Sequence, residues 1–257
     1  MRLFDTHVHL SDRKFDENRT EVIDRLLAAG VEKCIDVACD LRDVSRTTDL
    51  AARYDGIYSA YGMHPHYAGD MTPAYLDLLT TLLSDEKCVA LGEIGLDYHY
   101  DFSPREVQRE WFALQLELAQ ERDIPAIFHI REAFGDCMDI LRAHKSKGIK
   151  AVMHCFSGSY ETARECLDMG MYIAFGGSLT FNNAHNLRDT AKRLPLDRLL
   201  IETDCPYMSP VPLRGTVNEP KNVALVAELL SQLHGISTEQ AAEQTFSNAE
   251  KFFFGKG

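Results

Sequence analysis

The sequence predicts an α/β protein folded as a single TIM (β/α)8 barrel. Eight short apolar segments alternate with segments of helical periodicity along 257 residues, and about 250 residues is the usual size of such a barrel. Histidine and acidic side chains also stand at the ends of several apolar segments, where the parallel strands of a barrel would bring them together. We therefore expect one domain over residues 1–257.

The first strand is expected to run into Asp5-Thr6-His7-Val8-His9. Side chains alternate faces along a strand, so Asp5, His7 and His9 share one face. Two imidazoles on one face can bind one metal ion together. Asp5 is expected to accept a hydrogen bond from one of these rings and so to fix its tautomer. A lone His-x-His pair is more often an ordinary buried pair, so the metal interpretation depends on the rest of the chain.

The remaining strands are short and apolar, and they are bounded by turn residues. They are expected at residues 33–38, 57–61, 89–93, 125–129, 150–154, 172–175 and 198–204. Helical spacing of apolar residues predicts helices at residues 18–29, 43–53, 73–83, 104–121, 133–144, 160–169 and 183–194. Two further helices, at residues 223–233 and 238–252, are expected to cover the outside of the barrel.

Strands that alternate with helices pair in parallel through crossover connections. An open doubly wound sheet is the alternative arrangement, but such a sheet usually carries a glycine-rich phosphate loop after its first strand. Here that turn contains the two histidines. The sequence therefore favours the closed barrel.

Charge and cysteine content limit the possible functions. With 39 acidic and 27 basic residues the net charge is −12, which offers no broad basic surface for duplex DNA. Seven cysteines without a Cys-x-x-Cys motif indicate reduced thiols in a cytoplasmic protein. We expect no secretory leader, no membrane span and no obligate protein partner.

Six candidate metal ligands fall at the C-terminal ends of the predicted strands: His7, His9, Glu93, His129, His154 and Asp204. This set is too large for one four-coordinate zinc ion with an open position, and it suits two divalent ions that share a carboxylate and a hydroxide. Mixed nitrogen and oxygen donors favour zinc, manganese, iron or a similar ion, and they make magnesium a weaker candidate.

The motifs around these residues resemble those of the TatD-type metal-dependent hydrolases, deoxyribonucleases of the amidohydrolase superfamily. The resemblance spans nearly the whole chain. In order, the motifs are Asp-Thr-His-Val-His-Leu, Gly-Met-His-Pro-His, Gly-Glu-Ile-Gly-Leu-Asp-Tyr, Phe-His-Ile-Arg-Glu-Ala, His-Cys-Phe-Ser-Gly, Glu-Thr-Asp-Cys-Pro-Tyr, Pro-Leu-Arg-Gly and Asn-Glu-Pro. A minor departure is His99, where the family often has an aromatic residue.

The resemblance implies a division of the ligands between two ions. His7, His9, Glu93 and Asp204 would hold the first ion, and Glu93 would bridge to a second. The second ion would also be held by His129 and His154. Glu93 and Asp204 are the catalytic candidates, with Asp204 as the acceptor of the proton from water.

The activity implied by the resemblance is that of a phosphodiesterase in which a metal-activated hydroxide attacks phosphorus. The expected substrate is DNA, most often a single-stranded 3′ end trimmed by an exonuclease. The acidic net charge fits such a substrate if only one or two phosphates enter the barrel mouth.

Two other functions remain open. One is an esterase or amidohydrolase, such as a D-aminoacyl-tRNA deacylase, because the same hydroxide attacks a carbonyl carbon. The other is a noncatalytic metal-binding barrel, which would be expected to have lost a ligand or the base; none is missing here.

Three residues are candidates for contacts with the substrate. The resemblance places His64 in this role, although a loop histidine taken alone is more often merely solvated. Arg131 and Arg214 could each pair with a phosphate, or each could be an ordinary surface salt-bridge donor.

Three other residues adjoin the ligand positions. Glu202 would face the barrel interior, where a hydrogen bond to a ligand histidine is favoured over catalysis. Cys155 and Cys205 would fall on the opposite strand face and pack against helices.

Overall fold

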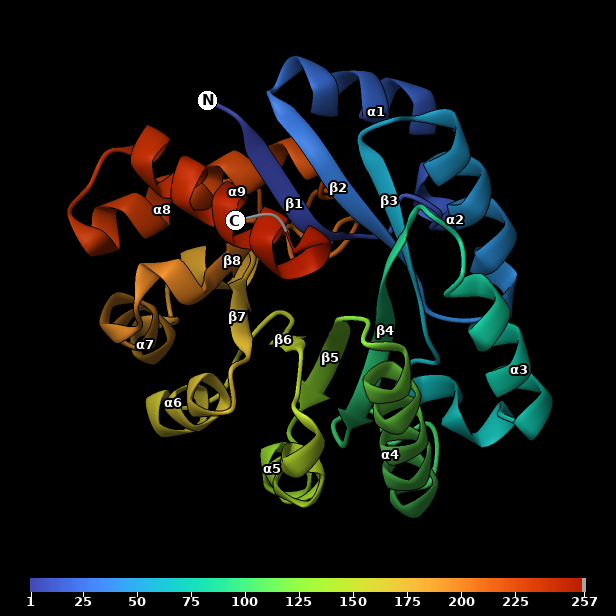
Figure 1. Ribbon diagram of the computed structural model, residues 1–257. Coiled ribbons are helices and arrows are strands. Elements are labelled where there is room, and N and C mark those ends of the chain that lie inside the picture. Colours follow the sequence, from blue (N-terminus) through green and yellow to red (C-terminus); the bar gives the residue numbers. More distant parts are fainter. Residues whose placement is uncertain (256–257) are drawn as a thin grey trace.

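The computed structural model describes residues 1–255, which form an eight-stranded parallel sheet ringed by helices (Figure 1). Each strand pairs in parallel with the next strand in the sequence. The TIM barrel is therefore confirmed. A doubly wound sheet is excluded, because the strands of such a sheet do not follow one another in sequence order.

The strands are β1 (Leu3–Val8), β2 (Val31–Ala38), β3 (Ile57–Tyr61), β4 (Cys88–Asp97), β5 (Ala126–Arg131), β6 (Ala151–Met153), β7 (Tyr172–Phe175) and β8 (Leu199–Ile201). The α-helices are α1 (Arg19–Ala28), α2 (Leu41–Arg53), α3 (Pro73–Leu82), α4 (Arg105–Arg122), α5 (Phe134–His144), α6 (Tyr160–Asp168), α7 (His185–Arg193), α8 (Val223–His234) and α9 (Thr238–Phe254). Most of the predicted ends lie within two residues of these bounds.

Two predicted strand ends were wrong. β4 continues past Glu93 to Asp97, after an irregularity in its register with β5 between Gly92 and Ile94. β8 ends at Ile201 rather than at Asp204. The backbone φ of 57° at Asp204 lies in the left-handed region, so the chain cannot continue there as a strand.

The segment after β8 closes the barrel against β1. Thr6 donates its hydroxyl to the carbonyl of Ile201 at 3.1 Å. The backbone N–H of Asp204 donates to the carbonyl of His7 at 2.9 Å, and that of His9 donates to the carbonyl of Cys205 at 2.8 Å. Closure therefore brings Asp204 beside the two histidines of β1.

Helix α9 closes the amino-terminal end of the barrel (Figure 1). Its side chains Phe246, Ala249, Phe252 and Phe253 pack into a buried cluster to which every strand contributes. The strand residues are Phe4, Ile35, Val37, Ala60, Val89, Ala90, Ile127, Val152, Tyr172, Ala174 and Leu200. The expectation that both C-terminal helices cover the outside was therefore wrong for α9, whose phenylalanines plug one end of the barrel. The opposite, C-terminal end of the barrel is not covered by α9.

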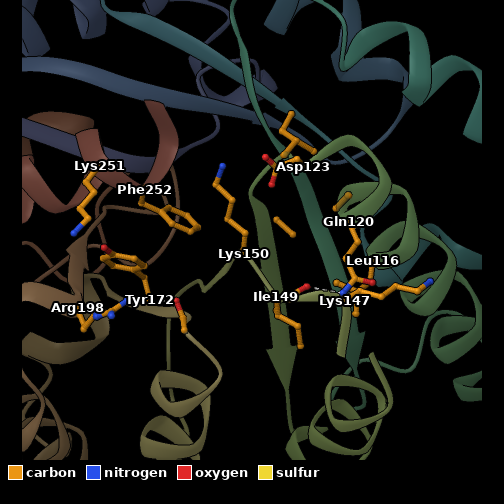
Figure 2. A pocket seen from close by; sticks show the side chains of 15 residues that line it. Leu116, Gln120, Asp123, Lys147, Ile149, Lys150, Tyr172, Arg198, Lys251 and Phe252 are labelled. Carbon is orange, nitrogen blue, oxygen red and sulfur yellow. Dashed lines mark hydrogen bonds between the residues drawn. The ribbon is translucent and has the colours of Figure 1, made fainter. Parts of the chain in front are cut away.

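A cavity of about 380 Å³ borders this plug, at the starts of β5 and β7 (Figure 2). Its lining includes Lys147, Lys150, Arg198 and Lys251, together with Tyr172 and Phe252. Among the described residues that line it, Asp123 is the single carboxylate, and none is a histidine. This cavity therefore lacks the mixed donor set that the sequence predicts for a metal centre.

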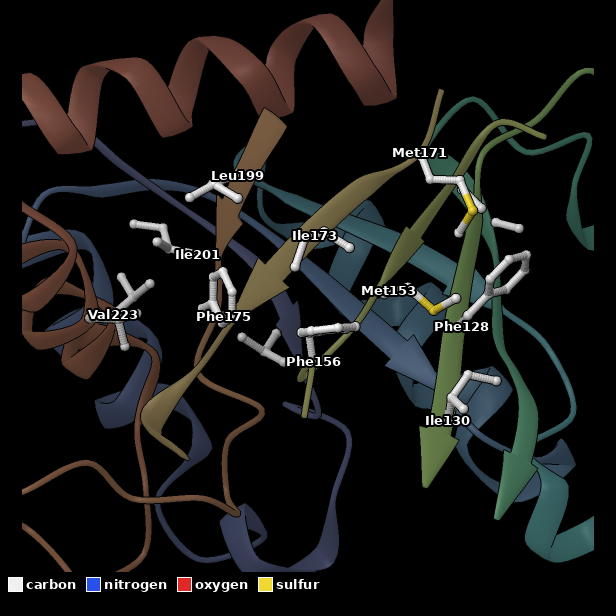
Figure 3. Close-up of a cluster of buried hydrophobic side chains, with 14 of the residues drawn as sticks. Phe128, Ile130, Met153, Phe156, Met171, Ile173, Phe175, Leu199, Ile201 and Val223 are labelled. Atoms are coloured by element: carbon white, nitrogen blue, oxygen red, sulfur yellow. The ribbon is translucent and has the colours of Figure 1, made fainter. Parts of the chain in front are cut away.

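The outer faces of the strands pack against the surrounding helices in a second buried cluster, part of which is shown in Figure 3. Neighbouring residues divide between the two clusters, as side-chain alternation requires. On β5 Ile127 points inward and Phe128 outward, and on β8 Leu200 points inward and Leu199 outward. Both faces of the sheet are thus buried, which is typical of parallel barrels.

All seven cysteines are free thiols. Cys205 is fully buried in the outer cluster, as the sequence predicted. No helix within residues 1–255 is both long and apolar enough to cross a membrane.

Candidate metal centre

A cavity of about 590 Å³ opens at the C-terminal ends of the strands. Its lining contains most of the predicted ligands and two histidines of the loop after β3. These residues are His9, His64, His66, Glu93, His129, His154 and Asp204. His7 is completely buried beside them.

Donor atoms of His7, His9 and Asp204 lie within 4.8 Å of one another on the β1 side, and one oxygen of Glu93 lies beside them. His7 Nε2 lies 3.2 Å from His9 Nε2 and 3.5 Å from Glu93 Oε2. His9 Nε2 lies 3.3 Å from Asp204 Oδ1. Because zinc–ligand bonds measure about 2.0–2.1 Å, the ligands of a tetrahedral ion stand about 3.3 Å apart. The spacing and chemistry of this group therefore fit one divalent ion.

The other oxygen of Glu93 faces a second group of histidines. Glu93 Oε1 lies 2.7 Å from His129 Nδ1, 3.2 Å from His154 Nε2 and 3.9 Å from His64 Nε2. A carboxylate with each oxygen turned toward a different group of imidazoles has the geometry that a bridge between two ions requires.

The second group differs in one respect from the predicted ligand set. The donor atoms of His64, Glu93 and His129 all lie within 4.8 Å of one another, whereas His154 forms such a group with His7 and Glu202. His154 is held between two carboxylates, Glu93 on one side and Glu202 on the other. Both His154 and His64 are therefore candidates to complete the donor group formed by Glu93 and His129.

Two outer contacts orient the imidazoles. His154 Nδ1 lies 2.9 Å from Glu202 Oε1, so Glu202 contacts a predicted ligand histidine, although the two groups are not aligned for the hydrogen bond that the sequence analysis expected. His9 Nδ1 lies 2.9 Å from the carbonyl oxygen of Val37, which favours the tautomer with a proton on Nδ1 and a free Nε2.

The outer role predicted for Asp5 was wrong. Its carboxylate accepts hydrogen bonds from the backbone N–H of Thr203 at 2.8 Å and from the Thr203 hydroxyl at 2.6 Å. The register of β1 against β2 shifts between Asp5 and Val8, so simple alternation does not carry Asp5 to the imidazoles. Asp5 instead ties β1 to the segment that carries Asp204.

Asp97 is a buried site residue that sequence reasoning missed. Its Oδ2 lies 3.0 Å from His129 Nε2 and 2.9 Å from His66 Nε2. Burial opposes ionisation of Asp97, but its contacts with these two histidines hold its pKa well below the usual range. The available signal was the even spacing from Glu93, which places both carboxylates on one face if the strand continues.

Two cysteines lie closer to the centre than expected. Cys155 was predicted to pack against helices, but its sulfur groups with donor atoms of His154 and Asp204. It follows the end of β6 with a φ of 42°, so strand alternation no longer applies. Cys39 Sγ lies 3.6 Å from Glu93 Oε2, and burial raises the pKa of the Cys39 thiol to about 12. In the absence of an ion, Cys39 is therefore a neutral thiol at pH 7, and its sulfur lies within 4.8 Å of donor atoms of His9 and Glu93.

The three predicted substrate contacts are not equivalent. His64 and Arg131 line the cavity. Arg214 lies outside its lining, where its guanidinium stacks 3.8 Å from the ring centroid of Phe181 and donates to the carbonyl of Ser209. The structure therefore brings two of the three together.

The centre contains buried carboxylates that are ionised and can therefore bind cations. Burial opposes ionisation of Glu93, but four surrounding histidines hold its pKa well below the usual range. Burial likewise opposes protonation of His154, but Glu202 and Glu93 raise its pKa to about 9. In the absence of an ion, His154 is protonated at neutral pH and compensates the buried carboxylates.

Zinc binding is expected to release protons at pH 7, because an imidazole must be neutral to bind a metal. Burial opposes protonation of His9, but Cys39 and Asp204 raise its pKa. With a pKa of about 9 for His154 as well, the apparent affinity should rise as the pH increases above 7. Titration calorimetry in buffers of different ionisation enthalpy measures the released protons. His144→Ala, which removes a histidine outside the cavity, should not alter the count. A zinc affinity independent of pH above 7 would contradict the expectation.

A barrel whose strand ends gather histidines and carboxylates around one cavity defines a metal-dependent hydrolase. The chain belongs to the TatD family, since the profile of the family described as TatD related DNase matches residues 4–254. The resemblance predicted from the motifs is thereby confirmed.

Individual relatives match along their whole length. The chain is 44% identical over 251 residues to the uncharacterized metal-dependent hydrolase YabD of Bacillus subtilis, covering 98% of each chain. It is 32% identical to a Klebsiella pneumoniae protein named 3′-5′ ssDNA/RNA exonuclease TatD, covering 98% of this chain and 97% of the relative. The crystal structure of YJJV, a TatD homolog from Escherichia coli K12, superposes with a TM-score of 0.92 at 32% identity and covers 98% of each chain.

Proposed function

We propose that this protein is a phosphodiesterase that trims single-stranded DNA from its 3′ end, with two divalent ions in the metal centre. The observation that carries the proposal is Glu93, whose two oxygens face separate groups of histidines at one cavity. The name of the Klebsiella relative supports a single-stranded nucleic acid as the substrate.

The metal ligands on this proposal are His7, His9, Glu93, His129, His154 and Asp204. When bound there, divalent ions supply Lewis-acid polarisation of the phosphate and lower the pKa of water. On this proposal Asp204 accepts the proton. Burial opposes its ionisation, but contacts with His9, His154 and His7 lower the pKa of its carboxyl, so it is a carboxylate at neutral pH.

The acidic surface restricts how DNA can be held. Among the described residues that line the cavity, Arg131 is the only lysine or arginine. Few phosphates can therefore be neutralised at once, which fits an enzyme that admits only the end of a strand. Arg131 lies on the same face of β5 as His129, so a phosphate between them would sit beside the metal centre.

Arg131→Ala is expected to raise the KM for DNA about tenfold or more while metal content stays unchanged, because charge-assisted hydrogen bonds contribute about 1.5–3 kcal/mol. Steady-state kinetics together with elemental analysis measure both quantities. Arg214→Ala is the matched control, because Arg214 lies outside the cavity lining and its loss should leave KM unaltered. An unchanged KM in Arg131→Ala would remove Arg131 from the binding site.

The proposal is tested with protein stripped by a chelator and reloaded with zinc or manganese. The substrates are 3′- and 5′-labelled single strands, an aryl phosphodiester and a D-aminoacyl-tRNA. We expect shortening from the 3′ end that depends on metal and saturates at close to two ions per chain. Hydrolysis of the aminoacyl-tRNA alone would identify a deacylase. A lack of activity under every metal condition would favour a noncatalytic barrel, and saturation at one ion would overturn the two-ion centre.

A further inference from the structure

Two aromatic side chains are exposed at the rim of the active-site cavity. Phe102 is 68% exposed and Tyr100 is 48% exposed, and both line the cavity. Their rings are stacked, with centroids 5.2 Å apart and an interplanar angle of 22°. Exposed apolar patches that adjoin a cavity often mark binding sites.

The segment that carries these rings is held at both ends. At its start, the carboxylate of Asp97 accepts the backbone N–H of Tyr100 at 2.9 Å. At its end, the buried Ser103 donates its hydroxyl to the carbonyl of His66 at 3.0 Å and accepts the N–H of Gly69 at 2.9 Å. The backbone that carries the rings is therefore held in place, which lowers the entropic cost of binding.

The stacked rings are close to the metal ligands, from which His66 and Asp97 separate them. The ring of His66 lies 4.8 Å from that of Phe102 and 5.3 Å from that of Tyr100. His66 and His129 both contact the carboxylate of Asp97. On the other side, the Arg131 guanidinium lies 4.8 Å from the centroid of Tyr100. The aromatic face thus stands next to the candidate phosphate contact.

We propose that Tyr100 and Phe102 form a stacking platform for the terminal bases of a single-stranded nucleic acid. This inference rests on the proposed function and extends it to the choice of strand. Stacking on aromatic rings holds any base, because every base has a π face. Stacking supplies binding affinity that a protein with an acidic surface and few basic side chains does not obtain from contacts with phosphates. It also selects unpaired ends, since the bases of a duplex are already stacked on one another.

The test compares the metal-loaded protein with Phe102→Leu, which keeps an apolar side chain but removes the ring, and with Phe102→Trp, which restores one. Each is assayed on a single strand and on the same strand with abasic 3′-terminal nucleotides. We expect Phe102→Leu to raise the KM for the normal strand about tenfold, with kcat unchanged and full metal content. Phe102→Trp should restore the KM, and the abasic strand should not distinguish the three proteins.

Tyr160→Leu is the control. Like Tyr100 in the platform, Tyr160 lies under an arginine, Arg193 at 3.5 Å, but it lies on α6 outside the cavity lining. This substitution should leave the KM unaltered. If the parent protein trims DNA and Phe102→Leu does so with the parent KM, the platform is wrong and the proposed function stands. Equal losses on the normal and abasic strands would also overturn the platform, because bases would then not be the partner. If the parent protein trims no strand, the proposed function itself fails and the platform fails with it.

Discussion

Glu93→Gln is expected to reduce bound metal from close to two ions per chain to one or none, and to lower turnover by about 10³ or more. The substitution keeps the shape of the side chain but removes the charge that both groups of histidines face. Lewis-acid stabilisation by a metal contributes several kcal/mol, and each 1.36 kcal/mol corresponds to a factor of ten in rate. Elemental analysis of the purified protein and single-turnover kinetics measure the two effects.

Glu202→Gln is the matched control for this substitution. Glu202 is also a buried carboxylate, but its contacts are with His154 and the backbone N–H of Cys155 rather than with both groups of histidines. Loss of such an outer partner typically lowers metal affinity by 10- to 100-fold, so Glu202→Gln should be restored by added metal. If Glu93→Gln keeps two ions and the parent rate, Glu93 is not the bridge between them.

The fold was predictable because the same physical signal repeats along the chain. Each strand is a short apolar run, and each helix has an apolar face that must be buried against the sheet. Helix α9 shows the limit of that signal. Its pattern predicts a buried face through Phe246, Ala249 and Phe253, but it does not say whether the face covers the side of the barrel or its end.

The site was predictable where a residue stands at a strand end, and it was missed where local geometry interrupts a strand. His7 and His9 could be grouped with Glu93 because barrel topology brings the C-terminal halves of the strands together, even though β4 continues past Glu93. Asp97 was missed because apolar and glycine spacing does not reveal that β4 continues past an irregular register. Asp5 was misplaced for a similar reason, since the register shift after it changes which groups it faces.

Asp204→Asn is expected to retain bound metal and to lose turnover by about 10² to 10⁴, the usual contribution of a positioned general base. Asparagine keeps a ligating oxygen but cannot accept the proton. It also tolerates the left-handed conformation of residue 204, where φ is 57°, so the closure of the barrel against His7 should be unaffected. Elemental analysis and a pH–rate profile measure metal content and turnover on one preparation.

Asp204→Ala provides the contrast, because it removes the ligating oxygen as well as the base and should lose an ion together with turnover. An Asp204→Asn variant that holds its metals and works at near the parent rate across neutral pH would show that another group takes the proton. Glu202 and His64 are the next candidates. Glu202 already accepts the backbone N–H of Cys155. Burial and the neighbouring His129 hold the pKa of His64 well below its ordinary value, so His64 is neutral at pH 7 but a weaker base than an ordinary histidine.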